Sequence, residues 1–345
     1  MNLVVATLLG QDGLTNGAIY ALLALAILLV FSVTRILLIP QGEFVSFSAL
    51  TMAAMQSGKP VQLGWLLLAL CAISLLMDLA ASVRASGRWR IQPAMIWCSA
   101  IVLLLTLVTQ LVPLAKAGTL VQAALTIALV TAFGPLLYRV VFQPIAAAHS
   151  LVLLIVSIAA HVALVGIGLL MFGPEGMRTE PFTDISFDIG PAMLNGQSLC
   201  VVLLSLVLIA LLYAFFERTL YGKALRATAV DQLGAQLVGI SPALAGQASF
   251  LLAALIGALS GVLIAPLTTI YYDSGFIIGL KGFAGAIIGG LASYPLAAIG
   301  AVALGLAESF STFWASSYKE VIVFTLLLPV LLWRSLAHGN VGDRE

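Results

Sequence analysis

The feature that most constrains this chain is the recurrence of long apolar stretches along nearly its whole length. Of its 345 residues, 62% are hydrophobic and 8% are charged, whereas soluble domains carry roughly a quarter of charged residues. The mean hydropathy is +1.15. Such a chain lacks the polar side chains to cover a water-exposed surface, so it predicts a polytopic membrane protein. The net charge of +1 gives no indication of a nucleic-acid partner.

A helix needs about 20 apolar residues to cross a bilayer, and its backbone groups must be paired within the segment. We therefore expect an all-α polytopic membrane protein with about 10–11 transmembrane helices in a single transmembrane domain over residues 1–345. A shorter apolar stretch lies at 282–293. The full-length spans are expected near residues 14–33, 41–57, 62–83, 93–113, 117–138, 150–172, 199–216, 246–267, 297–314 and 320–337.

Lysine and arginine predict the orientation, because cytoplasmic loops are enriched in them. With the N-terminus outside and 282–293 counted as a crossing, the C-terminus is cytoplasmic, and loops 173–198 and 217–245 are external and cytoplasmic. If 282–293 is re-entrant instead, the C-terminus lies outside. The inside positions would be Arg35, Arg84, Arg88, Arg90, Arg139, Arg218, Lys223, Arg226, Arg334 and Arg344, and the outside ones Lys59, Lys116, Arg178 and Lys319. The external loop carries Glu175, Glu180, Asp184 and Asp188.

The cytoplasmic loop contains the polar sequence YGKALRATAVDQLGAQLVGISP, which predicts two short ordered helices. Asp231 is expected to cap the second helix, and Gly239 to end it. Apolar residues at a spacing of four predict one stripe through Leu225, Ala229, Leu233 and Leu237. Two functions fit this loop equally on local chemistry: a solvated face that meets anionic lipid, or a docking element for a cytoplasmic partner.

Charged residues at membrane depth are functional candidates, because their burial in lipid is costly. Glu43, Lys281 and Glu308 are such candidates, with the alternative that they lie at span ends and reach the interface. For Asp78, near the end of its span, the interfacial interpretation is favoured. The GxxxG spacings in GALSG (257–261) and GAIIG (285–289) predict close helix packing.

Catalytic and cofactor motifs are missing from the sequence. There is no HExxH pattern, no GxSxG elbow and no GxxxxGK[ST] phosphate loop. We therefore expect no enzyme activity, metal site or cofactor in this chain. Any ATP that drives transport would be bound and hydrolysed by another chain.

Three segments resemble the branched-chain amino acid permease subunits of bacterial ATP-binding-cassette importers. The first is YGKALRATAVDQLGAQLVGI, which is similar to the family's cytoplasmic coupling segment; the matching positions are Gly222, Arg226, Ala227, Ala229, Asp231, Ala235, Gly239 and Ile240. The second, GLKGFAGAIIGGLASYPLAAIGAVALGLAES, matches at Lys281, Phe283, Gly289, Gly290, Ser293, Pro295, Gly300, Gly305 and Glu308. The third is the opening span, with Asn16, Gly17, Tyr20, Ala21, Leu22, Gly42 and Glu43 in place.

The resemblance covers about residues 1–57 and 117–337. Residues 60–115 look like an added hydrophobic hairpin, and LIPQGE stands where the family has an NFAHGE-type sequence. The resemblance implies a permease in the bacterial cytoplasmic (inner) membrane that translocates branched-chain or related amino acids. The implied partners are two ATPase subunits with ATP and Mg, a second permease subunit, an extracytoplasmic solute-binding protein and membrane lipid.

The implied site residues fall into two groups. Coupling to the ATPase would involve Gly222, Lys223, Arg226, Asp231 and Gly239, while the translocation pathway candidates are Glu43, Lys281, Phe283 and Glu308. The external loop would help to dock the binding protein. Two alternatives stay open: the same machinery carrying urea, an amide or a sugar, and a stand-alone ion-coupled carrier in which Glu43, Lys281 and Glu308 relay protons.

Overall fold

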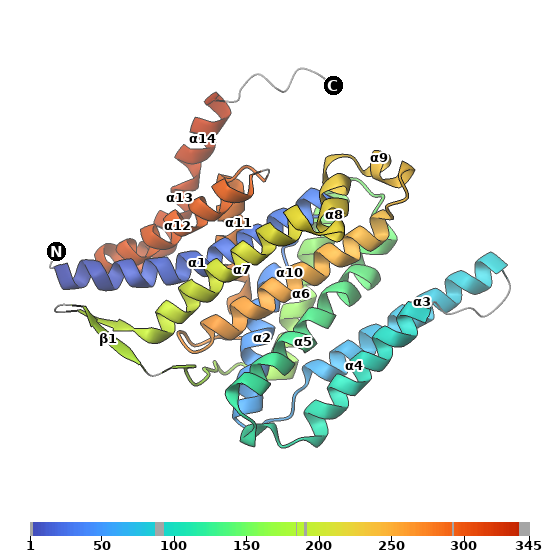
Figure 1. Ribbon diagram of the computed structural model, residues 1–345, viewed down its shortest axis with the longest axis horizontal. Helices are drawn as coiled ribbons and strands as arrows, with labels where there is room; N and C mark the ends of the chain where they lie inside the picture. Colours follow the sequence, from blue (N-terminus) through green and yellow to red (C-terminus); the bar gives the residue numbers. More distant parts are fainter. Residues whose placement is uncertain (1–2, 87–92, 184, 190–191, 292, 338–345) are drawn as a thin grey trace. The chain divides into compact units, whose positions relative to one another are not determined.

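The computed structural model describes residues 3–86, 93–183, 185–189, 192–291 and 293–337 (Figure 1). Arg88, Arg90, Asp184 and Arg344, which entered the sequence analysis, lie outside these residues. The α-helices are α1 (Leu3–Thr34), α2 (Gln41–Gln56), α3 (Leu63–Ser86), α4 (Pro93–Leu111), α5 (Thr119–Leu137), α6 (Ser150–Phe172), α7 (Gly196–Arg218), α8 (Leu220–Val230), α9 (Gln232–Leu237), α10 (Pro242–Ile264), α11 (Ser274–Ile288), α12 (Tyr294–Ala315), α13 (Lys319–Thr325) and α14 (Leu327–Ala337). Shorter elements are the 3-10 helices η1 (Leu114–Lys116), η3 (Gln143–Ile145) and η4 (Ser316–Tyr318), the π-helix η2 (Tyr138–Phe142), and strands β1 (Ser186–Ile189) and β2 (Ala192–Asn195).

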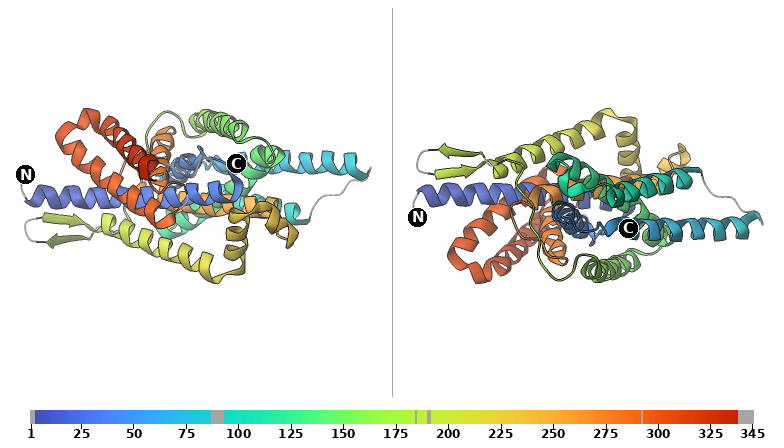
Figure 2. Two further views of the ribbon diagram at one scale, coloured as in Figure 1. Left: turned by 90° about the horizontal axis from the view of Figure 1, so that it is seen from above. Right: turned by 90° about the horizontal axis from the view of Figure 1, so that it is seen from below.

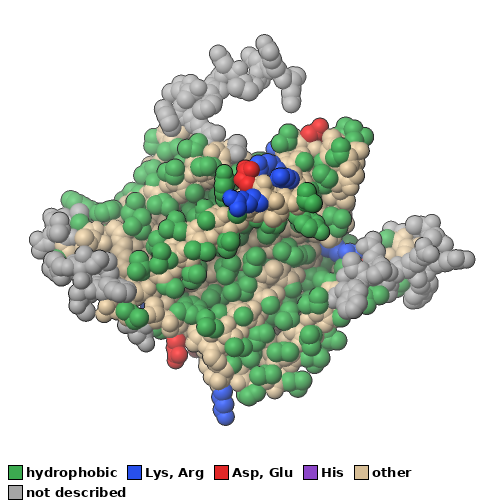
Figure 3. Space-filling view, viewed as in Figure 1, with side chains coloured by type: hydrophobic (Ala, Val, Ile, Leu, Met, Phe, Trp, Pro, Cys, Tyr) green, Lys and Arg blue, Asp and Glu red, His purple; other side chains and the backbone are tan. Residues whose placement is uncertain are grey.

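Within the described residues, 7 helical stretches are long and apolar enough to cross a membrane. They confirm the all-α polytopic class, but they are fewer than the about 10–11 transmembrane helices expected from sequence. Two shorter apolar stretches, Cys98–Leu111 and Ser274–Ile288, fall below that length. The crossing-length stretches are Val4–Thr34, Leu63–Val83, Thr119–Ile145, Ser150–Phe172, Gly196–Arg218, Pro242–Ile264 and Tyr294–Leu332. On the face shown in Figure 3, hydrophobic side chains are spread over the described surface and charged side chains are few, as expected for lipid contact.

One stretch predicted from sequence has wrong bounds. The stretch 282–293 is not one helix, because α11 ends at Ile288 and a turn follows in which Gly290 and Leu291 have positive φ angles of 68° and 53°. At a rise of about 1.5 Å per residue, α11 is about 22 Å long, short of the roughly 30 Å hydrocarbon core. The stretch predicted at 320–337 is found from Lys319 to Ala337, with a one-residue break at Leu326 between α13 and α14. Pro329, near the start of α14, has no N–H to continue the hydrogen-bond ladder across this break.

The described helices form two compact units. Unit 1 comprises residues 1–28, 183–211 and 280–345, and unit 2 comprises residues 29–182 and 212–279. Unit 1 contains the β1–β2 hairpin, which is antiparallel with Ser186 opposite Asn195 and leads into α7 (Figure 2).

Unit 2 is built around α2, in which every residue from Gln41 to Met55 is buried. The helix α10 approaches α2 closely because Gly257 and Gly261 lie against Phe44 and Val45. This confirms the packing role predicted for the GALSG spacing. Aromatic rings of Phe44 and Phe47 pack on Phe133 of α5 with centroid distances of 5.5 and 6.0 Å.

The helices α3 and α4 of unit 2 pack against each other and run side by side in Figures 1 and 2. Their contact is close at Gly64, which faces Thr106. Gln110 of α4 donates from Nε2 to the carbonyl of Val61 at 2.9 Å. The pair is thereby tied together at the end where α3 begins.

Candidate functional site

The α8–α9 segment, residues 220–239, forms two short helices, as predicted. Thr219 caps α8 by accepting from the Gly222 N–H at 3.0 Å. Asp231 ends α8 and caps α9 by accepting from the Leu233 N–H at 2.9 Å. Gly239 follows with a φ of 88°, a conformation that other residues rarely adopt. These contacts confirm the capping role predicted for Asp231 and the stop at Gly239.

The single apolar stripe predicted through this segment is wrong in its second half. Leu225 is buried against Leu29, Val33 and Ala245, but Leu233 and Leu237 are exposed by 71% and 84%. The extended backbone of Asp231 (φ −149°, ψ 110°) breaks the helical register, so residues on either side no longer share a face. The segment therefore has one anchored helix and one helix with an exposed apolar surface.

The ends of α1 and α10 hold the segment in place. Gln232 donates from Nε2 to the carbonyl of Val33 at 2.8 Å, at the end of α1. Gly222 lies directly against the backbone of Phe215 and Phe216, where a Cβ atom would collide. The exposed Arg226 pairs with Glu217 at 3.0 Å, and Lys223 is also exposed.

In unit 1, Lys281 and Glu308 form a buried ion pair. Lys281 Nζ lies 2.5 Å from Glu308 Oε1, and the Tyr20 hydroxyl donates to Glu308 Oε2 at 2.8 Å. Lys281 Nζ also lies 5.6 Å from the centre of the Tyr20 ring. The triad joins α1, α11 and α12, and each of its charged or hydroxyl groups has a partner. Phe283 follows Lys281 on α11 and is half-buried.

Small residues bring the three helices of this triad together. A Cβ atom at Gly305 of α12 would collide with Gly17 of α1, and one at Gly285 of α11 would collide with Ala301 of α12. Gly289 likewise faces Ala297, which confirms the packing role predicted for the GAIIG spacing. Close backbones let short polar contacts form across helices.

In unit 2, Glu43 is fully buried in the first turn of α2. Its Oε1 lies 2.7 Å from His161 Nδ1 of α6, and the His161 ring stacks on Phe276 at 4.6 Å. Its Oε2 has no hydrogen-bond partner among the described residues. Sequence reasoning missed His161 and the role of Tyr20; a histidine inside a long apolar span is the signal that would have found the first.

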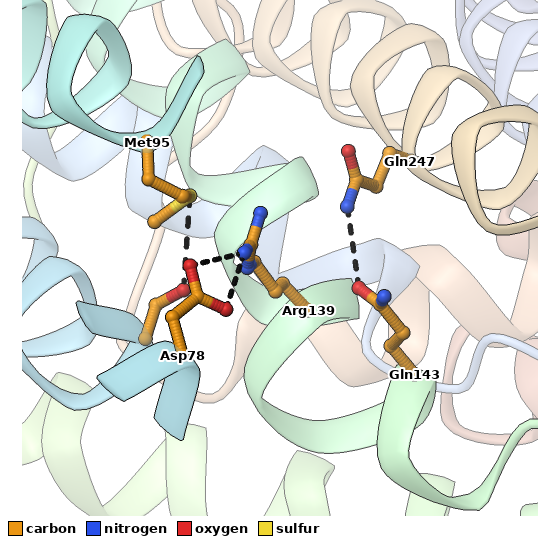
Figure 4. Close-up of polar contacts among 6 residues, drawn as sticks. Asp78, Met95, Arg139, Gln143 and Gln247 are labelled. Carbon is orange, nitrogen blue, oxygen red and sulfur yellow. Dashed lines mark hydrogen bonds and ion pairs between the residues drawn. The ribbon is translucent and has the colours of Figure 1, made fainter. Parts of the chain in front are cut away.

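Asp78 forms a bidentate ion pair with Arg139 at 2.6 and 2.5 Å (Figure 4). The pair joins α3 to the π-helix η2, next to a contact between Gln143 and Gln247 at 3.2 Å. Both charged side chains are partly exposed, at 18% and 13%. The ion pair gives Asp78 a counter-charge within unit 2, and its position at the membrane interface stays a prediction.

The segment that follows α6 is tied to the loop after α10. Met177 and Ile270 form an antiparallel bridge, and Arg178 donates from Nε to the carbonyl of Pro266 at 2.8 Å. Glu175 and Glu180 are exposed. No group of three or more metal-ligating side chains gathers anywhere in the described parts of the chain.

These features define a class: a multi-span helical membrane protein with charged pairs inside its helix bundles and an exposed helical segment between two spans. The sequence comparisons give the family. Residues 11–331 match the permease component of branched-chain amino acid transport systems, and the chain belongs to this family. It is a membrane permease subunit.

Individual relatives carry the same description. The chain is 31% identical over 230 residues to the high-affinity branched-chain amino acid transport system permease protein BraD of Pseudomonas aeruginosa, covering 64% of this chain and 74% of that protein. It is 29% identical over 213 residues to LivH of Escherichia coli K12, covering 60% and 69%. A probable LivH of Methanocaldococcus jannaschii is 30% identical over 129 residues, covering 35% and 41%. No solved structure matches the chain.

Proposed function

We propose that this permease subunit imports branched-chain or related amino acids across the bacterial cytoplasmic membrane as part of an ATP-binding-cassette importer. Its partners would be two cytoplasmic ATPase subunits, a second permease subunit and an extracytoplasmic solute-binding protein. The family match and the names of the relatives support the solute class. ATP and Mg would bind to the ATPase chains, since this sequence has no phosphate loop.

The observation that carries the proposal is the anchoring of the α8–α9 segment. Its inner face is fixed to the ends of two spans through Leu225 and Gln232. Its outer face presents apolar side chains that are at least 71% exposed. A partner that binds the outer face would therefore push directly on α1 and α10. The exposed apolar residues are Leu220, Tyr221, Val230, Leu233, Leu237 and Val238.

The five proposed coupling residues divide into two roles. Gly222, Asp231 and Gly239 would keep the segment in shape, through close packing, helix capping and a positive φ angle. Lys223 and Arg226 would contact the ATPase, because both are exposed. The surface pair of Arg226 with Glu217 is half exposed, so it contributes little to stability and can exchange partners.

The proposed orientation has the N-terminus outside and the C-terminus inside, with loop 217–245 cytoplasmic and loop 173–198 external, and it counts the 15-residue helix α11 as a crossing. Its support is the bias of lysine and arginine toward one set of loops. The exposed Glu175 and Glu180 give the external loop acidic groups that could help to dock the binding protein.

The proposed pathway residues are Glu43, Lys281, Phe283 and Glu308. Lys281 and Glu308 are paired with each other here, so they would contact solute only in a conformation that separates them. Glu43 keeps one oxygen without a partner.

The test is leucine uptake into proteoliposomes that contain the permease pair and the ATPase. The binding protein is added on the side of the membrane that carries the external loop 173–198. Wild type is expected to need ATP and the binding protein. The variant Arg226→Ala is expected to fold normally but to hydrolyse ATP without uptake, and Arg226→Lys is the matched control for charge. Uptake without an ATPase would contradict the proposal and would instead indicate an ion-coupled carrier. ATP-driven uptake of urea, an amide or a sugar instead of leucine would correct the solute class. Normal leucine uptake by Arg226→Ala would refute the coupling role of Arg226.

A further inference from the structure

Glu43 is a fully buried carboxyl group with only half of its hydrogen-bonding capacity used. Oε1 is 2.7 Å from His161 Nδ1, and Oε2 has no partner among the described residues. Buried polar atoms nearly always have a partner in the folded chain, in ordered water or in a ligand. The open oxygen therefore identifies a place where something other than this unit's own side chains is expected to bind.

Several contacts fix the residues next to Glu43 and the ring of its partner His161. Gly42 packs directly on the backbone of Gly275 in α11. Gln41 donates from Nε2 to the carbonyl of Ala253 in α10 at 3.0 Å. His161 is in turn stacked on Phe276. A carboxylate whose neighbours are fixed in this way is preorganised for a ligand.

The chemistry of Glu43 Oε2 indicates which class of ligand it would bind. Oε2 is an acceptor on an acidic group, and the ion-pair partner of Glu43 in the described residues is His161, not a lysine or arginine. A primary ammonium group supplies both a positive charge and up to three N–H donors. The ring of Phe276 stacks on the His161 ring. The His161 side chain is 13% exposed and the Glu43 side chain is 0% exposed, so a ligand would reach Oε2 only in a conformation that opens this contact.

We infer that Glu43 is the acceptor for the ammonium group of the transported solute, with His161 as the residue that positions its carboxylate. This inference rests on the proposed function and adds a binding site for one named group of the solute. Such a site would favour amines over acids that lack the amino group. A free monovalent cation would use the same acceptor, so the experiment includes both sources.

The experiment measures the thermal unfolding midpoint of the assembled permease–ATPase complex in nanodiscs, without binding protein or ATP. The probes are leucine, isoamylamine (ammonium without carboxylate), 4-methylpentanoate (carboxylate without ammonium) and NaCl. A ligand that binds the folded state raises the midpoint as its concentration rises. For wild type, leucine and isoamylamine are expected to raise the midpoint, and 4-methylpentanoate and NaCl are not.

The variant Glu43→Gln is expected to raise the half-saturating concentration of both amines by about tenfold or more, because a charge-assisted hydrogen bond is lost. The control Thr131→Val removes another buried oxygen without a partner, on α5, and is expected to keep the wild-type response. If Glu43→Gln does not fold, Glu43→Asp keeps the charge but withdraws it by one methylene, and a similar weakening is expected.

Three results would overturn the inference: equal responses to amines in wild type and the Glu43 variants, a response to 4-methylpentanoate as large as that to isoamylamine, or a response to NaCl alone. Failure of the inference is distinguishable from failure of the proposed function. If wild type shows ATP-driven leucine uptake while Glu43→Gln binds amines normally, only the inference fails. If wild type shows no amino acid uptake with its partners present, the proposed function fails.

Discussion

Two buried carboxyl groups of this permease subunit, one in each compact unit, differ in how completely they are paired. Glu308 in unit 1 has a partner on each oxygen, Lys281 on one and Tyr20 on the other. Glu43 in unit 2 has a partner on one oxygen only, although it is even more deeply buried, at 0% against 7% exposure.

This difference in pairing indicates two different roles for a buried charge in a membrane protein. A fully paired triad that joins three helices through short contacts holds those helices together in this conformation, because each of its polar groups already has a partner. A carboxyl group with an open oxygen is less favourable for the resting chain but is ready to bind a cation. From sequence the two glutamates appear equivalent; their partners distinguish them.

The largest effect is expected from breaking the paired triad. Glu308→Leu leaves the Lys281 ammonium buried without a counter-charge, which is expected to lower the free energy of unfolding by about 3–5 kcal/mol. The double variant Lys281→Met with Glu308→Leu removes both charges and is expected to recover most of that loss. Chemical unfolding in detergent measures both. A double variant as unstable as the single one would show that the pair does not act as a unit.

A smaller effect is expected from making Glu308 resemble Glu43. Tyr20→Phe removes the hydroxyl that donates to Glu308 Oε2 and leaves that oxygen without its partner. The expected loss is about 1.5–3 kcal/mol, the usual range for a hydrogen bond to a charged group. The same unfolding experiment checks it. No loss of stability would mean that an unpaired carboxylate oxygen lowers the free energy of unfolding very little in this protein. The difference in pairing between Glu308 and Glu43 would then not imply a difference in their roles.

The smallest effect is expected at an unpaired oxygen that carries no charge. Thr131→Val removes a buried hydroxyl that has no partner among the described residues. Because no hydrogen bond is lost, stability is expected to stay the same or rise by up to about 1 kcal/mol. A marked fall in the unfolding midpoint would indicate that Thr131 Oγ1 makes a contact to water or lipid.

The sequence predicted elements well where local chemistry decides them. Apolar length located most of the long helices, and Asp231 and Gly239 located the break and end of the α8–α9 segment. It failed where distant residues decide. Two local effects were missed as well, namely the exposure of Leu233 after the turn at Asp231 and the break before α14 near Pro329. Neither the pairing of Glu43 with His161 nor that of Glu308 with Tyr20 follows from spacing, because the partners are 118 and 288 residues apart.

The most direct test of the central claim, that the open oxygen of Glu43 receives an ammonium group, is an infrared difference spectrum of the nanodisc complex with and without isoamylamine. Isoamylamine carries no carboxyl group, so any change in the carboxylate stretching bands comes from the protein. The expected result is a band change in wild type that persists in Thr131→Val and is absent in Glu43→Gln. A spectrum without a carboxylate change, or a change that persists in Glu43→Gln, would contradict the claim.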